Sequence, residues 1–99
     1  LEVLTVLLSL KVAHSHRVAL LRGHHENRHL NYHLGLRQEC EERLGPVEGP
    51  RTYECLNRVF EHMSLAAVVS SQILVLGPSA LPASLTRLDQ LKRYKKPLV

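Results

Sequence analysis

Aspartate is almost missing from this chain of 99 residues, in which Asp89 is the only one. Tryptophan is absent, and four aromatic residues are too few for the row of stacking platforms that holds a single-stranded nucleic acid. Cys40 and Cys55 stand apart with no CxxC spacing, which predicts free thiols in a cytoplasmic protein. The apolar run over residues 1–13 falls short of the ~20 residues that span a bilayer, and it has no basic leader or cleavage site. We therefore expect no membrane partner.

What is present fits one small domain over residues 1–99, since 44% of the residues are hydrophobic and could fill a core. The formal charge of +4 is modest, and the basic residues are scattered except for the run from Lys92 to Lys96. A solvated basic tail over residues 92–99 is the expected form of that run, with no nucleic acid as a partner.

The order of apolar and polar residues predicts a mixed α/β fold in the order α-β-α-α-β-β-α. Residues 1–12 predict a mostly buried helix, because polar positions 2, 5 and 9 form one stripe, and residues 17–21 predict a short buried strand. Steps of three and four predict a helix over 30–44, a Gly- and Pro-rich loop follows at 45–50, and a third helix covers 53–63. The runs 66–69 and 73–76 predict a hairpin joined by 70–72; 77–82 is irregular, and 84–94 predicts a last helix capped by Ser84.

The densest motif is the run L-L-R-G-H-H-E-N-R-H over residues 20–29. The predicted strand leads into it, and Gly23 lets the backbone turn sharply, so that the next two side chains can face a common site. The motif resembles L-L-R-G-N-H-E-x-R-H, the third conserved block of the PPP family of serine/threonine protein phosphatases. His24 stands where that family has Asn.

The resemblance covers nearly the whole chain. Residues 1–12 resemble the family's helix ending in A-L-K-V, and residues 28–30 and 38–40 match the R-H-L and Q-E-C of the calcineurin branch. Residues 59–69 resemble F-x-x-L-P-L-A-A-L, residues 72–76 the strand Q-F-L-C-V, and residues 88–97 the stretch L-D-R-F-K-E-P with a gap.

The resemblance implies part of a calcineurin-like metallophosphoesterase fold, a β sandwich flanked by helices. It also implies two divalent metals (Mn, Fe or Zn) in the family, and phosphoprotein substrates or regulatory subunits as partners. By resemblance, His25 is the general acid that protonates the leaving alcohol, and His24 takes the place of the Asn metal ligand. Arg22 and Glu26 are expected to support the loop through hydrogen bonds.

The departures from the family are equally informative. The blocks G-D-x-H-G and G-D-x-V-D-R-G, which supply most metal ligands, do not occur, and Asp89 lies in the wrong segment. A further family His ligand falls on Gly77, which has no side chain to donate. We therefore expect no metal centre, or an incomplete one, and no phosphatase activity from these 99 residues alone.

Two alternatives stay open at this point. A pseudophosphatase or interaction module would keep the fold and bind phosphatase partners or substrates. A His-rich zinc protein is the other, because His25, His29 and His33 are spaced i, i+4 and i+8 and would share one face if a helix began at His25.

Overall fold

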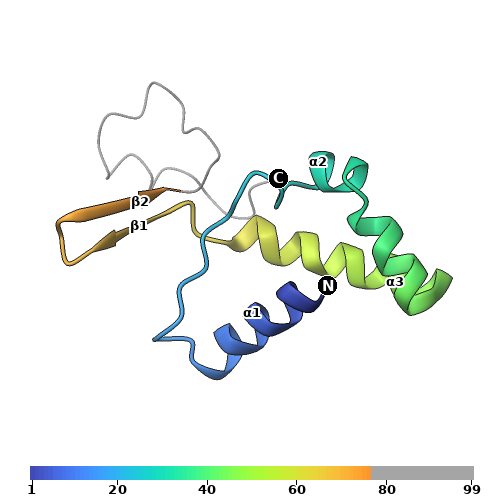
Figure 1. The fold of residues 1–99 in the computed structure, drawn as a ribbon, viewed down its shortest axis with the longest axis horizontal. Helices are drawn as coiled ribbons and strands as arrows, with labels where there is room; N and C mark the ends of the chain where they lie inside the picture. Colours follow the sequence, from blue (N-terminus) through green and yellow to red (C-terminus); the bar gives the residue numbers. More distant parts are fainter. Residues whose placement is uncertain (77–99) are drawn as a thin grey trace.

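The computed structural model describes residues 1–76 as three helices and a β hairpin (Figure 1). The elements are α1 (Glu2–Ala13), α2 (Arg28–His33), α3 (Leu36–His62), β1 (Ala66–Val69) and β2 (Ile73–Leu76). The predicted mixture of helix and strand is confirmed at this coarse level. The predictions of an irregular segment, a last helix and a basic tail concern residues beyond 76 and lie outside the described residues.

Helix α1 forms where the sequence predicts it, but it is not a mostly buried helix. No residue of α1 is buried, and only Leu1, Leu4 and Leu8 pack against the core. Apolar residues also occupy the other side, where Val3 is 71% and Val6 58% exposed. A polar stripe limited to positions 2, 5 and 9 predicts burial of the remaining faces, but the described elements cover α1 on one side alone. At the end of α1, the Lys11 ammonium donates to the carbonyls of Ser15 and Val18, at 2.9 and 2.6 Å.

The strand predicted over residues 17–21 is wrong. This segment runs beside the C-terminal end of α3 (Figure 1), and its one ladder contact is an isolated parallel bridge between Leu21 and Ser64. Arg22 continues the contact, since its amide donates to the Ser64 carbonyl at 2.8 Å. A strand needs a neighbour to satisfy its backbone groups, and the residues that the structure describes offer it one bridge.

The single helix predicted over residues 30–44 is divided at Gly35. Helix α2 ends at His33, and Gly35 takes φ 97° and ψ 8° as the N-cap of α3. A left-handed residue cannot continue a right-handed helix, and glycine adopts that conformation without the steric penalty of a Cβ.

The loop predicted over residues 45–50 is also wrong, because α3 passes through it as a kink. Gly45 alone is non-helical, with φ 91° and ψ 175°, and Pro46 begins the second half of the helix. Proline is well suited to a first helical position, where its missing N–H would have no partner anyway. Gly49 is buried where the two halves meet. Two glycines and two prolines thus build a sharp bend between helical segments.

The predicted hairpin is confirmed, with β1 and β2 antiparallel and Val69 paired with Ile73. The Gln72 amide donates to the Val69 carbonyl at 3.0 Å, and Ser70 and Ser71 take φ 53° and 58°. Positive φ at both central residues matches the hairpin's right-handed twist. All four side chains of β2 are exposed.

The core is small and lies along α3, with one member before the kink at Gly45 and three after it. Cys40, Tyr53, Leu56 and Phe60 are its buried apolar members. Both cysteines are free thiols, as predicted, with Cys40 buried and Cys55 exposed; burial raises the pKa of Cys40. Among residues 1–76, no helix is long and apolar enough to cross a membrane.

Candidate functional site: the histidine loop

The predicted site residues of the motif lie between α1 and α2; we name residues 22–28, which end at the first residue of α2, the histidine loop. Glu26 folds it, because its carboxylate accepts the Gly23 amide at 2.6 Å while its own amide donates to the Gly23 carbonyl at 3.2 Å. The Arg22 guanidinium donates from Nε to the Glu26 carbonyl at 2.7 Å, and Arg22 is 8% exposed. Arg22 and Glu26 are thus hydrogen-bonded within the loop, and their supporting role at a phosphatase site stays a prediction.

His24 and His25 occupy the tip of this loop, and both side chains are exposed. Their rings meet edge to face, with centroids 4.4 Å apart and planes at 81°. The two residues singled out from the motif are therefore brought together. Their imidazoles are exposed to solvent and lie against each other.

A cavity of about 360 Å³ opens beside His25. Its wall is mostly apolar, with Leu4 and Leu7 from α1, Leu34 and Leu36 near the break between the helices, and Phe60. His25 and Glu26 contribute the polar side of the wall together with Asn31 and Glu39. His25, the residue predicted to be a general acid, thus lines a mostly apolar cavity.

The donor set does not fit the two-metal centre that the resemblance implies. Within the described residues, no group of three or more His, Cys, Asp or Glu side chains is placed to hold one ion. The zinc alternative also loses its geometric condition, because α2 begins at Arg28 and His25 lies outside it. Gly77, where the family's further His ligand falls, lies outside the described part of the chain.

The downstream end of the histidine loop is fixed by charge. Arg28, the first residue of α2, donates from Nε to Glu61 at 2.8 Å and from its two terminal nitrogens to Glu54 at 3.3 and 3.2 Å. These two carboxylates raise the pKa of the guanidinium, Glu54 contributing first. Asn27 caps α2 by accepting the His29 amide at 3.0 Å.

A buried polar contact joins α2 to α3 beneath these charges. The Asn31 side chain donates to that of Asn57 at 2.8 Å, and the Tyr53 hydroxyl donates to Asn31 at 2.8 Å. Asn57 in turn donates to the Tyr53 carbonyl at 3.0 Å, and it is 1% exposed. The helix that follows the histidine loop is thereby fixed in its rotation against α3.

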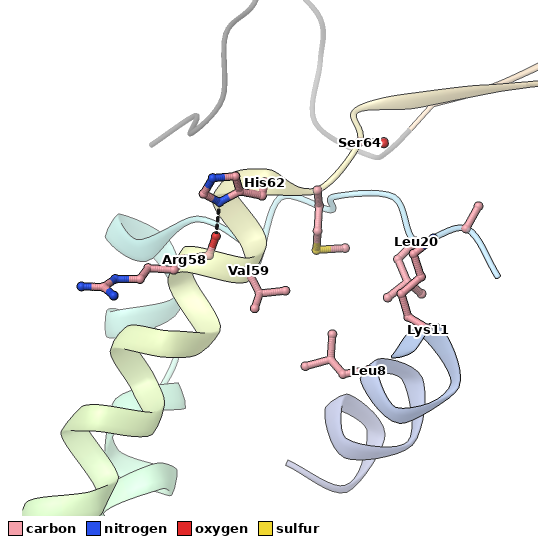
Figure 2. A pocket seen from close by; sticks show the side chains of 9 residues that line it. Leu8, Lys11, Leu20, Arg58, Val59, His62 and Ser64 are labelled. Carbon is pink, nitrogen blue, oxygen red and sulfur yellow. Dashed lines mark hydrogen bonds between the residues drawn. The ribbon is translucent and has the colours of Figure 1, made fainter. Parts of the chain in front are cut away.

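A larger groove of about 570 Å³ lies between α1, residues 19–20 and the end of α3 (Figure 2). Leu8, Leu20 and Val59 turn apolar side chains toward it, while the guanidinium of Arg58 points away. His62 folds back onto its own helix, where Nδ1 lies 2.7 Å from the Arg58 carbonyl. Neither histidine of the loop lines this groove, and it carries no carboxylate.

Comparison with known proteins shows which proteins this chain is similar to. Over 98 residues, 99% of the chain, it is 34% identical to the serine/threonine-protein phosphatase BSL2 of Arabidopsis thaliana. Over 92 residues, 93% of the chain, it is 33% identical to the serine/threonine-protein phosphatase SIT4 of Candida albicans. The chain is related to the serine/threonine protein phosphatases. The resemblance predicted from its motifs is confirmed, and the assignment to the calcineurin branch stays a prediction.

This relationship covers a part of each phosphatase. The chain spans 10% of the length of BSL2 and 28% of that of SIT4. No family model matches it. The histidine loop therefore belongs to a phosphatase-like segment, and the activity of a whole phosphatase is a matter for proposal.

Sequence reasoning missed the residues of α3 that hold the loop. The motif contains Arg28 but assigns it no role, and no pattern in the sequence marks Glu61 or Ser64. The available signal was weak: Glu61 is a lone carboxylate beside the apolar position Phe60, 33 residues from the arginine that it binds.

Proposed function

We propose that this chain is part of a serine/threonine protein phosphatase domain, in which the histidine loop faces the phosphorylated side chain of a protein substrate. The observation that carries the proposal is the identity of 34% over 98 residues with a serine/threonine protein phosphatase. The fold of the loop supports it, because Gly23 and Glu26 turn the backbone so that two adjacent imidazoles reach solvent together.

His25 is the proposed proton donor to the leaving alcohol of phosphoserine or phosphothreonine. A general acid must reach the leaving oxygen and must be oriented by a partner. His25 is exposed beside a cavity, so substrate can reach it. His24 holds the position of a family ligand, and an imidazole can ligate a metal but cannot supply the N–H donors of an amide to phosphate.

The 99 residues by themselves are proposed to be catalytically inactive. The part of the chain that the structure describes supplies no three-donor metal group, and the His25 ring lies edge to face against the ring of His24. The alternative of a pseudophosphatase that binds phosphoproteins gains support from the same loop. Its shape is held by backbone, arginine and glutamate contacts and needs no metal.

Two readouts on the purified chain test this proposal. Phosphate release from a phosphothreonine peptide with Mn²⁺ should not exceed that of the His25→Gln variant or of buffer with Mn²⁺. The NMR signals of His24 and His25 should nevertheless shift on addition of that peptide and stay in place with its unphosphorylated form. Turnover that His25→Gln abolishes would contradict the inactivity. Equal responses to both peptides would contradict the phosphatase-like role of the loop.

A further inference from the structure

The two ends of the histidine loop are bound to the same place on α3. At the upstream end, the Arg22 amide donates to the Ser64 carbonyl at 2.8 Å. At the downstream end, Arg28 donates to the Glu61 carboxylate at 2.8 Å. Glu61 and Ser64 are three residues apart, at and just beyond the C-terminal end of α3. Both ends of the loop are therefore anchored on a single short segment at the end of α3.

The two carboxylates that bind Arg28 differ in burial. The Glu61 side chain is 9% exposed, whereas that of Glu54 is 47% exposed. An exposed ion pair contributes little, because water and salt screen it. A desolvated, charge-assisted hydrogen bond is stronger and holds a narrower geometry. Glu61 is therefore the partner that fixes the position of Arg28.

We infer that Glu61, acting through Arg28, is a positioning residue that sets the orientation of His24 and His25. The inference rests on the proposed function only in taking His25 as the proton donor. The two imidazoles keep their edge-to-face contact because both ends of the loop are anchored on α3.

Neighbouring contacts show why Glu61 has this effect and Glu54 does not. The Arg28 carbonyl accepts the Tyr53 hydroxyl at 3.3 Å, and the Asn27 side chain caps the helix that Arg28 begins. These bonds fix the backbone of α2. Glu61 binds the side chain of Arg28 to the end of α3. It lies three residues before Ser64, whose carbonyl accepts the Arg22 amide. Glu54 lies seven residues earlier on α3, well away from Ser64.

A matched pair of variants tests the inference by NMR of the imidazole ring protons. Glu61→Ala and Glu54→Ala each remove one carboxylate from Arg28. Spectra are recorded at about pH 8, above the ordinary histidine pKa of about 6.5, so that protonation is the same in all samples. In Glu61→Ala, the signals of His24 and His25 are expected to move toward those of the exposed His14 and His16. In Glu54→Ala, they are expected to stay in place.

Circular dichroism melting separates positioning from general stability. A lower melting temperature for Glu61→Ala with unmoved ring signals would overturn the inference and leave a stabilising ion pair only. Equal shifts in both variants would overturn it as well. If Glu61→Ala does not fold, Glu61→Gln keeps the shape of the side chain, and the same ring signals decide. None of these outcomes depends on phosphopeptide binding, so the failure of the proposed function would be seen separately.

Discussion

The Cα of Gly49 lies against the backbone of Glu41, so that a Cβ placed on Gly49 would stand 2.5 Å from the Glu41 Cα. The same Cβ would meet the Cys40 carbonyl oxygen at 2.8 Å. The two halves of α3 therefore touch backbone to backbone, directly after the kink at Gly45. This contact encloses Cys40, which is fully buried, and so it supports the core on which the histidine loop is anchored.

We expect Gly49→Ala to destabilise the fold by about 3 kcal/mol, because a methyl group meets backbone that cannot turn aside. Chemical denaturation followed by circular dichroism measures this change. Glu48→Ala, one residue earlier on an exposed position, is the control and should stay within about 0.5 kcal/mol of the parent. A Gly49→Ala protein as stable as this control would show that the two halves of α3 do not approach so closely.

Gly35 and Gly45 both have positive φ but should respond differently to asparagine. Gly35, at φ 97° and ψ 8°, lies near the left-handed helical region that asparagine tolerates, whereas Gly45, at φ 91° and ψ 175°, lies where essentially only glycine is found. Apart from the adjoining backbone, no atom of residues 1–76 lies within 4 Å of a Cβ at either position, so the difference is one of backbone conformation. Gly45→Asn should cost about 2 kcal/mol more than Gly35→Asn in the free energy of unfolding. Equal losses would contradict the extended conformation at Gly45.

Asn57→Ala should destabilise the chain by about 3 kcal/mol, because it leaves the buried amide of Asn31 without its acceptor. The matched control is the double variant Asn31→Ala with Asn57→Ala. The double variant should cost less than the sum of the two single changes, since both partners of the bond are removed together. Strictly additive losses in denaturant unfolding would argue against a direct bond between these side chains.

The exposed carboxylate of Glu2 should titrate abnormally. Its own backbone amide, and then the hydrogen bond from Arg43, lower its pKa from 4.5 to about 2. A carboxylate with a lowered pKa in the folded state stabilises the fold above its ordinary pKa, and this contribution is lost as the pH falls from 4.5 toward 2. In Arg43→Gln, an NMR titration should show the pKa of Glu2 raised yet still below 4.5, because the amide remains. An unchanged pKa would exclude the contact with Arg43.

Two substitutions in the turn should make the hairpin more stable. Ser70 and Ser71 hold positive φ, which costs a residue with a Cβ roughly 1–2 kcal/mol, and Asn-Gly suits such a turn far better. Replacing both as Ser70→Asn with Ser71→Gly should stabilise the hairpin by about 1 kcal/mol, seen as slower amide hydrogen exchange in β1 and β2. Ser70→Ala with Ser71→Ala is the control and should not slow exchange. A gain in the alanine control would show that the turn is not of this type.

The parts of the fold that sequence predicts well are those decided by neighbouring residues. Helix α1 follows from a run of leucines without a breaker, and the hairpin from two β-prone runs around Ser70 and Ser71. The position and turn of the histidine loop follow from its motif, and the comparisons bear out the resemblance that the motif carries.

The parts that sequence misses depend on distant partners. Residues 17–21 look like a strand, yet whether an apolar run becomes a strand depends on a neighbour with which it can pair. Pro46 looks like the start of a loop, but it also suits the first turn of a helix, and the close contact at Gly49 decides between them. The bond between Arg28 and Glu61 crosses 33 residues, and local periodicity cannot indicate it.

Within residues 1–76, the hydrogen bonds that shape the histidine loop involve neither the imidazole of His24 nor that of His25; they are made by Arg22, Gly23, Glu26, Arg28, Glu61 and Ser64. Folding therefore places little constraint on which residues stand at positions 24 and 25. Either histidine or asparagine could stand at position 24 during evolution with almost no effect on the fold of the loop. The residues that shape the loop and the residues at positions 24 and 25 can therefore change at different rates. Conservation of the loop-shaping residues would not show that the catalytic residues are conserved.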